Sequence, residues 1–187
     1  MAASLEREIK LRFPSAEAAR AAVTAAGATL KTERRLQHDK LLDTPDGRLR
    51  SIRSVLRVRL EAHQSFITFK GPVQASSMKV REEIETSVEQ GRDVLEILER
   101  LGFSVWFRYE KYREEFSLGD VVLAIDETPV GTFVELEGSE RGIITVARLL
   151  GFGPDRFVLD SYRGLFLKDC ETRGLPATDM IFDPGAA

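Results

Sequence analysis

The segment that follows the first three residues alternates charged side chains with apolar ones. In SLEREIKLRF, Glu6, Glu8 and Lys10 recur at every second position, while Ile9 and Leu11 fall between them. Because successive side chains of a β-strand point to opposite faces, this spacing places both carboxylates and the ammonium group on one face. Such a face can bind a cation through its carboxylates and an anion through its bases.

Similar charged faces recur along the chain. The acid pairs Glu83/Glu85 and Glu135/Glu137 repeat the spacing, and VLRVRLE and YEKYREEF carry bases in phase. A one-sided antiparallel sheet normally turns its polar face to water, but surface strands usually mix Thr, Ser, Gln and Asn with their charges. These faces are almost purely ionic, and like charges on one face repel unless they are neutralised. We therefore interpret them as the lining of a closed channel. The expected lining acids are Glu6, Glu8, Glu83, Glu85, Asp126, Glu135 and Glu137, and the expected bases are Lys10, Arg57, Arg59, Lys70, Arg81, Lys111 and Arg113.

A lining of this charge density needs bound partners. Buried charges are tolerated only when they are paired or bound to ions. Clustered carboxylates suit hard divalent cations such as Mg²⁺ or Mn²⁺, and clustered arginines and lysines suit phosphate oxygens. The pattern therefore predicts a small closed barrel whose lumen holds a metal–polyphosphate complex.

Strand patterns dominate the sequence, and helical patterns lie between them. Helical periodicity covers 15–27, 91–102 and 139–151, and a short helix is expected within 159–174. We expect an α+β fold: an eight-stranded antiparallel β tunnel, closed as a barrel around a charged lumen, with helices packed outside. The expected strands are 5–13, 35–43, 55–62, 65–71, 78–88, 105–117, 120–127 and 131–138.

The composition indicates one globular domain. Of 187 residues, 43% are hydrophobic and 30% charged, and no linker-like or repeated segment divides them. We expect a single domain over 1–187, with its core at about 5–168 and a C-terminal tail at about 170–187. A net charge of −3 argues against a nucleic-acid partner. The only cysteine, Cys170, cannot form an internal disulfide. No apolar run is long enough to span a bilayer, and no apolar leader precedes Glu6. We therefore expect a cytoplasmic protein without a membrane partner.

Several of these segments occur in the order typical of one known family. EREIK is a Glu-x-Glu-x-Lys motif near the amino terminus, and LRVR, FK, REEIE, KYR, DETPVGTFVELE and a final SY follow it. In this ordered set, over roughly residues 5–168, the chain resembles the CYTH superfamily, the triphosphate tunnel metalloenzymes. The resemblance implies an eight-stranded antiparallel tunnel. It also implies kinship with class IV adenylyl cyclases, thiamine triphosphatases and inorganic triphosphatases.

The resemblance further implies roles for the charged residues. Mg²⁺ or Mn²⁺ would be bound by Glu6, Glu8, Asp126, Glu135 and Glu137. The implied catalytic set is Glu6, Glu8, Lys10, Glu83 and Glu85. The triphosphate would be gripped by Lys10, Arg57, Arg59, Lys70, Arg81, Lys111 and Arg113, with Lys168 closing over it from the C-terminal segment.

The segment QHDKLLDTPDGRL departs from the family pattern. Leu41 and Leu42 stand where relatives often carry an aromatic residue in a Tyr-Tyr-Asp-Thr type of stretch, while Asp39, Asp43 and Pro45 remain in register. The tunnel fold is still expected, but this segment does not identify the subfamily.

The motifs leave the reaction open. With water as nucleophile the protein would be a triphosphatase, and with the ribose 3′-hydroxyl of ATP it would be a cyclase that forms cyclic AMP and pyrophosphate. Hydrolysis is the main expectation, with tripolyphosphate, ATP or thiamine triphosphate as the substrate. A module that binds polyphosphate without turnover is a further alternative, but an anion binder gains nothing from seven carboxylates. The protein is expected to be a monomer or a homodimer.

Overall fold

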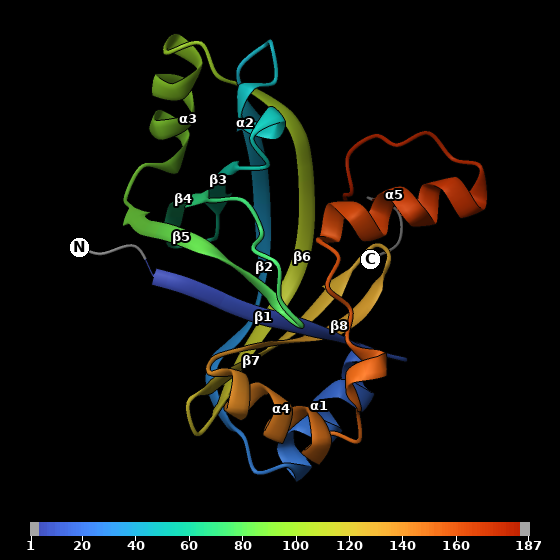
Figure 1. The fold of residues 1–187 in the computed structure, drawn as a ribbon. Coiled ribbons are helices and arrows are strands. Elements are labelled where there is room, and N and C mark those ends of the chain that lie inside the picture. The colour runs from blue at the N-terminus through green and yellow to red at the C-terminus, as the bar shows by residue number, and fades with distance from the viewer. Residues whose placement is uncertain (1–3, 184–187) are drawn as a thin grey trace.

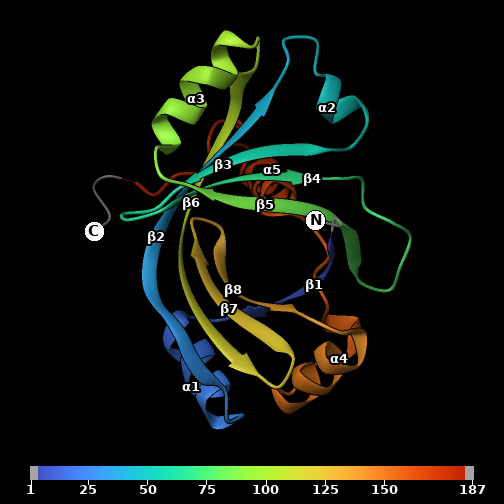
Figure 2. The same cartoon turned by 90° about the vertical axis from the view of Figure 1, so that its left-hand side faces the viewer.

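Eight antiparallel strands close into a barrel in the computed structural model, which describes residues 4–183 but not the side chain of Ser4. The strand order around the ring is β1-β5-β4-β3-β2-β6-β7-β8 (Figures 1 and 2). The closed eight-stranded barrel expected from the sequence is confirmed. The strands are β1 (Ser4–Phe13), β2 (Thr29–Asp43), β3 (Val55–Leu60), β4 (Ser65–Lys70), β5 (Lys79–Val88), β6 (Ser104–Leu118), β7 (Val121–Thr128) and β8 (Gly131–Glu137).

The four longer helices, α1, α3, α4 and α5, lie within the segments that the sequence patterns indicate, whereas the short α2 and the turn η1 were not expected. Ser15, Ser139 and Ser161 each accept a hydrogen bond from the amide three residues later, at 3.0–3.2 Å, which satisfies a free N–H of the first turn. Gly174 ends the last helix in the left-handed region, with φ 64°, where glycine has no steric penalty. None of the helices in 4–183 is both long enough and apolar enough to cross a bilayer. The helices are α1 (Ala16–Ala25), α2 (Arg48–Ser51), α3 (Gly91–Arg100), α4 (Glu140–Leu149), η1 (Pro154–Arg156, a 3₁₀ turn) and α5 (Tyr162–Arg173).

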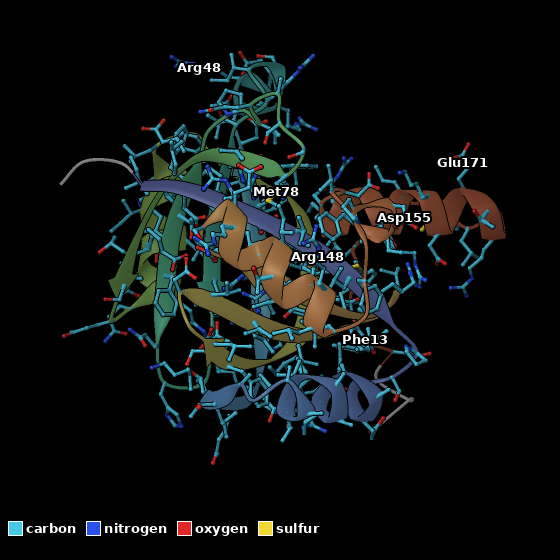
Figure 3. The ribbon with its side chains drawn as sticks, turned by 60° about the horizontal axis from the view of Figure 1, so that its bottom comes forward. Phe13, Arg48, Met78, Arg148, Asp155 and Glu171 are labelled. Atoms are coloured by element: carbon cyan, nitrogen blue, oxygen red, sulfur yellow. The ribbon has the colours of Figure 1, made fainter. Side chains whose placement is uncertain are left out.

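The main apolar core lies between the outer face of the barrel and two helices. α1 and α4 lie together on one side of the barrel, next to β1 (Figure 3). Burial of each Leu or Ile side chain in this core stabilises the fold by about 1.5–3 kcal/mol. The apolar faces of the strands therefore point outward to the helices, and the alternate, charged positions point into the lumen. The core residues include Ile9, Leu11, Leu123, Ile125, Val134 and Leu136 from the strands and Ala19, Val23, Ile143, Val146 and Ala147 from the helices.

Two further helices cover other parts of the barrel. α3 packs Leu95 against Leu42 and Val58 on the outer face of β2 and β3. α5 differs from the expectation that every helix lies outside, because Tyr162 in its first turn lines the lumen. The rest of α5 is anchored by Phe166, which packs in a cluster of mostly aromatic residues. α5 thus brings a residue from outside the strands into the cavity.

The structure departs from the sequence expectation at β2 and at the tail, whereas β6 spans nearly the residues expected for it. β2 begins at Thr29 instead of 35, because its exposed first residues pair with the end of β6 through two register shifts. Tertiary pairing rather than local alternation makes that extension a strand. In the expected tail, Met180 is fully buried and exchanges backbone hydrogen bonds with β6 at 2.9 and 3.0 Å. Residues 184–187 of that tail lie outside the described part of the chain.

Candidate active site

The barrel encloses a cavity of about 740 Å³, a volume typical of small-molecule sites. Eleven lysines and arginines and seven glutamates line it, so its wall is net positive. Asp126 and Lys168 are the only residues of the predicted site that do not line the cavity. The charged wall residues are Glu6, Glu8, Lys10, Arg50, Arg53, Arg57, Arg59, Lys70, Lys79, Arg81, Glu83, Glu85, Lys111, Arg113, Glu115, Glu135, Glu137 and Arg163.

An acidic side forms where β1 runs between β5 and β8. Glu6 and Glu8 of β1 share this side with Glu83 of β5 and with Glu135 and Glu137 of β8. The strand register sets Glu8 directly opposite Glu137, and such a like-charge pair destabilises a sheet unless cations offset it. The fold therefore gathers carboxylates that repel one another on a single wall.

Glu137 is the carboxylate of this wall whose charge is least compensated. Within residues 4–183 its side chain has neither an ion pair nor a hydrogen bond, and burial together with Glu6 and Glu135 raises the pKa of Glu137 to about 7. Burial and Glu6 also raise the pKa of Glu83 to about 7, although Lys70 opposes the shift. A cation bound between these residues would favour the charged form of both.

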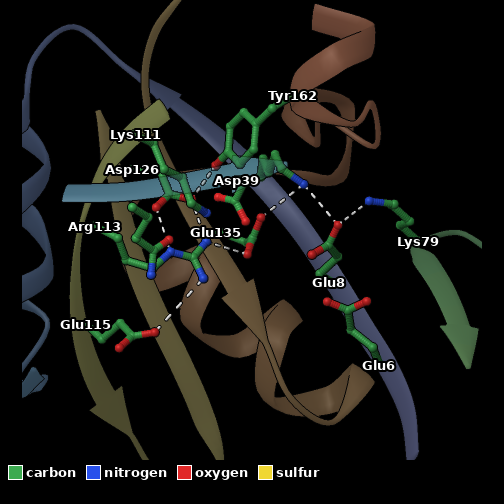
Figure 4. Close-up of polar contacts among 12 residues, drawn as sticks. Glu6, Glu8, Asp39, Lys79, Lys111, Arg113, Glu115, Asp126, Glu135 and Tyr162 are labelled. Atoms are coloured by element: carbon green, nitrogen blue, oxygen red, sulfur yellow. Dashed lines mark hydrogen bonds and ion pairs between the residues drawn. The ribbon is translucent and has the colours of Figure 1, made fainter. Parts of the chain in front are cut away.

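Lysines neutralise the other acids of the wall. Lys10 lies 3.0 Å from Glu8 Oε1 and 3.1 Å from Glu135 Oε2, and it is almost fully buried. Lys79 of β5 also pairs with Glu8 Oε1 (Figure 4). Burial and Glu135 disfavour the charged form of Glu8, but Lys10 and Lys79 outweigh them and lower the pKa of Glu8 well below its usual value. Glu8 and Glu135 are thus ionised.

Lys70 of β4 joins the acidic wall to the strands beyond it. Its ammonium nitrogen lies 2.8 Å from Glu6 Oε1 and 2.7 Å from Glu83 Oε2. Arg81 donates from Nε to Glu6 Oε2 at 3.1 Å. These bases sit beside the acids, so a phosphate bound to them would lie close to any cation that the acids hold.

Two arginines extend the basic wall along β3. Arg59 Nε donates to Asp39 Oδ1 at 2.9 Å, and Arg57 Nε lies 3.4 Å from the same oxygen. Arg57 also donates to Glu85 Oε2 at 3.0 Å. The second oxygen of Asp39 is buried, and no donor reaches it within residues 4–183. Asp39 therefore orients both guanidinium groups from behind and leaves their remaining N–H groups for an anion.

Tyr162 of α5 completes the other wall (Figure 4). Its hydroxyl donates to Asp126 Oδ2, which also accepts from Lys111 Nζ at 3.0 Å, while Arg113 Nε donates to Asp126 Oδ1 at 2.7 Å. The ammonium nitrogens of Lys10 and Lys111 lie 5.1 and 5.0 Å from the centre of the Tyr162 ring, within cation–π range. Burial and Arg113 lower the pKa of Lys111 to about 7 against the opposing effect of Asp126. The ring of Tyr162 thus contacts both Lys10 and Lys111, two residues that are expected to bind phosphate.

The acidic wall fits a hard divalent cation in donor type but is not pre-assembled around one. In the part of the chain that the structure describes, no three His, Cys, Asp or Glu side chains converge as ligands. Glu137 is uncompensated and of the donor type that Mg²⁺ and Mn²⁺ prefer, while Glu8 and Glu135 would have to part from Lys10 to bind a metal. Asp126, also expected as a metal ligand, lies off the cavity wall, and its oxygens already accept from Arg113, a lysine and a tyrosine.

Lys168 is not brought to the cavity. It is exposed on α5, and its Nζ lies 2.8 Å from Asp160 Oδ2. Lys168 follows the cavity-lining Tyr162 by six residues, which is about 240° around a helix, so it projects from another side. The C-terminal segment closes the cavity with Tyr162 and Arg163 instead.

Several wall residues were missed by the sequence analysis. Lys79 shares the charged face of Arg81, Glu83 and Glu85 in the sequence alternation, but it was not included among the expected lining bases. Tyr162 belongs to the SY motif, which carried no assigned role. Arg50 lies in α2, Arg53 in the turn after it and Arg163 in the first turn of α5, where no strand alternation predicts their direction.

Comparison with known sequences agrees with the motif order. The model of the CYTH domain family matches residues 4–150. A protein of Methanocaldococcus jannaschii, MJ0240, which is named as a candidate adenylate cyclase, is 30% identical over 147 residues. The match covers 71% of this chain and 84% of that protein.

Solved structures share the fold. The PH1819 protein of Pyrococcus horikoshii is 25% identical, with a TM-score of 0.76, and the match covers 88% of this chain and 99% of that one. A candidate adenylate cyclase of Vibrio parahaemolyticus is 19% identical, with a TM-score of 0.75, and covers 88% and 98%. HpAC1 of Hippeastrum, a candidate adenylyl cyclase described as having a dominant triphosphatase activity, is 20% identical, with a TM-score of 0.62, and covers 92% and 96%. The family model spans all eight strands and ends before α5, and by this match the chain belongs to the CYTH domain family.

Proposed function

We propose that this protein is a divalent-metal-dependent triphosphatase that acts on a triphosphate inside the barrel. The observation that carries the proposal is that one cavity of about 740 Å³ is lined by a group of carboxylates, of which Glu137 is uncompensated, and by a larger set of lysines and arginines. A metal–triphosphate complex complements both walls, because the metal is cationic and the phosphate chain is anionic. Neither partner alone would satisfy both sets of charges.

The acids of β1 and β8 would hold the metal. Glu6, Glu8, Glu135 and Glu137 are the carboxylates that share this wall. Bound Mg²⁺ or Mn²⁺ would neutralise phosphate oxygens and polarise phosphorus. Entry of the complex would also exchange the ion pairs of Lys10 with Glu8 and Glu135 for contacts between Lys10 and phosphate.

The bases would grip the phosphate chain and offset the charge that develops on the leaving group. Arg57 and Arg59 are oriented by Asp39, and arginine can bind phosphate oxygens through two parallel hydrogen bonds. In the step itself the oxygen of a water molecule bonds to the terminal phosphorus, the bond to the bridging oxygen breaks, and the shortened phosphate chain departs. Glu83, whose pKa is raised to about 7, is the carboxylate suited to accept the proton of the water.

Hydrolysis is favoured over cyclisation by what the wall lacks. Among the described residues that line the cavity there is no asparagine or glutamine, so these residues offer no side-chain amide to read the edge of a base. The name of the M. jannaschii relative supports the cyclase as the second candidate, and the activity described for HpAC1 supports hydrolysis. Both reactions use the same walls and differ in the nucleophile.

The test is a substrate panel. Phosphate release is measured from tripolyphosphate, ATP and thiamine triphosphate with Mg²⁺, with Mn²⁺ and with EDTA, and cyclic AMP and pyrophosphate are assayed in the ATP reaction. Metal-dependent phosphate release without cyclic AMP is the expected result. Formation of cyclic AMP and pyrophosphate in equal amounts would replace the triphosphatase with the cyclase. Tight triphosphate binding without any turnover would instead indicate a binding module.

A further inference from the structure

The mouth of the cavity near α2 and α5 carries a group of arginines that the sites described above do not use. Arg50 lies in α2, Arg53 lies in the turn between α2 and β3, and Arg163 lies in the first turn of α5. Trp106 of β6 lies among them, with the guanidinium carbons of Arg50 and Arg163 at 4.6 and 4.8 Å from its ring centre. These four residues, called the mouth cluster below, line the same cavity as the catalytic candidates.

The loop that presents two of these arginines is held by a buried carboxylate. Asp43 is 1% exposed and accepts from the backbone amides of Thr44, Leu49 and Arg50 at 2.8–3.1 Å. It also accepts from Arg50 Nε at 2.9 Å. Arg53 lies in the left-handed region, with φ 56°, which is uncommon for residues other than glycine, asparagine and aspartate. The loop is therefore an ordered support that places Arg53 at the cavity.

The positive charge of the mouth cluster is largely unmatched. Within residues 4–183, neither Arg53 nor Arg163 forms an ion pair with a carboxylate, and Nε of Arg163 is buried without a hydrogen-bond partner. Burial and the nearby Arg50 lower the pKa of Arg163. Among residues 4–183, the only carboxylate that forms an ion pair with the cluster is that of Asp43, which pairs with Arg50.

The balance of charge differs deeper in the tunnel. There the remaining eight lysines and arginines share the wall with seven glutamates, and Asp39 and Asp126 lie behind them. The excess positive charge of the cavity is thus at the mouth. Arg57 and Arg59 lie within β3, whereas Arg53 lies before that strand begins at Val55, in a turn with a left-handed backbone. A triphosphate held at Arg57 and Arg59 would leave the mouth cluster without an anion.

We propose that Arg53 and Arg163, with Arg50 and Trp106, form a further phosphoryl-binding subsite, so that the tunnel takes a chain of four or more phosphoryl groups. This inference rests on the proposed function and names the substrate class of the same site. A phosphoryl group fits better than a base here, because Trp106 is already in contact with two guanidinium groups and the cluster offers donors only.

The experiment compares linear inorganic tripolyphosphate with linear tetraphosphate. Binding is measured by titration calorimetry in EDTA, and kcat/KM is measured with Mg²⁺, for the wild type, Arg53→Asn, Arg163→Gln and the double variant. Asparagine tolerates the left-handed backbone at Arg53 while removing the charge. The matched control is Arg48→Ser, because Arg48 is exposed at the outer end of α2 and does not line the cavity (Figure 3).

The wild type should bind tetraphosphate at least about tenfold more tightly than tripolyphosphate, as one added charge-assisted contact implies. The double variant should lose this gain and keep its tripolyphosphate affinity within about twofold, and Arg48→Ser should change neither. Equal affinity of the wild type for both chains, or equal losses for both in the double variant, would overturn the proposal. If free phosphate alone binds in an Arg53-dependent way while tetraphosphate gains nothing, the subsite holds free phosphate and the assignment to a longer chain is wrong. Binding is measured in EDTA and does not depend on hydrolysis. A protein without triphosphatase activity would therefore contradict the proposed function, but the two binding affinities could still be compared.

Discussion

Glu137→Gln should make the metal-free protein more stable while it lowers turnover. The carboxylate of Glu137 faces Glu8 across the strand pair, and its pKa is raised from 4.5 to about 7 by burial and by Glu6 and Glu135. A folded-state pKa above the unfolded value means that the native state binds more protons between pH 4.5 and 7. Stability therefore falls as the pH rises through this window, and the full penalty applies above pH 7.

The size of the effect follows from that pKa. Each pH unit corresponds to about 1.36 kcal/mol, so a rise from 4.5 to about 7 sets an upper bound of about 3.4 kcal/mol. Glu137 lines the cavity, where its carboxylate is partly desolvated, but the residue as a whole is still open to solvent, so screening reduces the expected gain of Glu137→Gln to about 1–2 kcal/mol at pH 8. At pH 4.5 the gain should vanish, since the wild-type carboxyl is then protonated. For a chain of this size, each kcal/mol moves Tm by about 2–4 °C.

The assay is urea unfolding at pH 4.5, 6 and 8 in EDTA, repeated with Mg²⁺. The matched control is Glu135→Gln, because Glu135 pairs with Lys10 at 3.1 Å and Arg113 at 2.7 Å and its pKa is lowered. Removal of this buried partner should destabilise the protein by about 3–5 kcal/mol at pH 8. Added Mg²⁺ should stabilise the wild type more than Glu137→Gln, because only the wild type keeps the full set of ligands. The reasoning is refuted if Glu137→Gln is no more stable than the wild type at pH 8, or if its gain is the same at pH 4.5.

Other variants test individual walls of the site. Glu8→Gln, checked for folding by circular dichroism, should lower metal-dependent turnover by at least about 10²-fold, and near-normal rates at micromolar Mg²⁺ would remove Glu8 from the metal site. Arg59→Ala should mainly raise KM for triphosphate, by an amount equivalent to about 1.5–3 kcal/mol, and unchanged kinetics would exclude Arg59 from the grip. Tyr162→Phe keeps the ring beside Lys10 and Lys111 but loses the bond to Asp126, so steady-state kinetics should show a smaller loss than Tyr162→Leu gives. Equal losses in the two Tyr162 variants would contradict a role for the ring.

Local patterns along the chain were sufficient to predict the strands and most of the helices. Period-2 alternation marks β1, β3, β5 and β8, because each strand turns charged residues toward the lumen and alternates them with more apolar residues on its outer face. Ser15 and Gly27 bound α1 through capping preferences that act within a few residues. The short α2 and the first six residues of β2 were not anticipated, since an aspartate cap and long-range pairing with β6 form them.

The sequence also predicted most of the residues that line the lumen, but it did not predict which carboxylates are neutralised by bases. Alternation decides which residues share a face, so Glu6, Glu8 and Lys10 could be assigned to the cavity wall from spacing alone. Which carboxylate meets which base depends on barrel register. That register pairs Glu135 with Lys10 and leaves Glu137 uncompensated, although both glutamates lie in one motif.

By itself the sequence determined the strand count, the inward direction of the charged faces and the family, because these depend on the order and spacing of residues along the chain. Tertiary structure alone decided that Asp126 is held by Arg113, Lys111 and Tyr162 off the cavity wall, that Lys168 faces away, and that three arginines gather at the mouth. The physical reason is that these outcomes require segments far apart in sequence to meet. Closure of the barrel and docking of α5 bring those segments together, and local periodicity carries no information about either event.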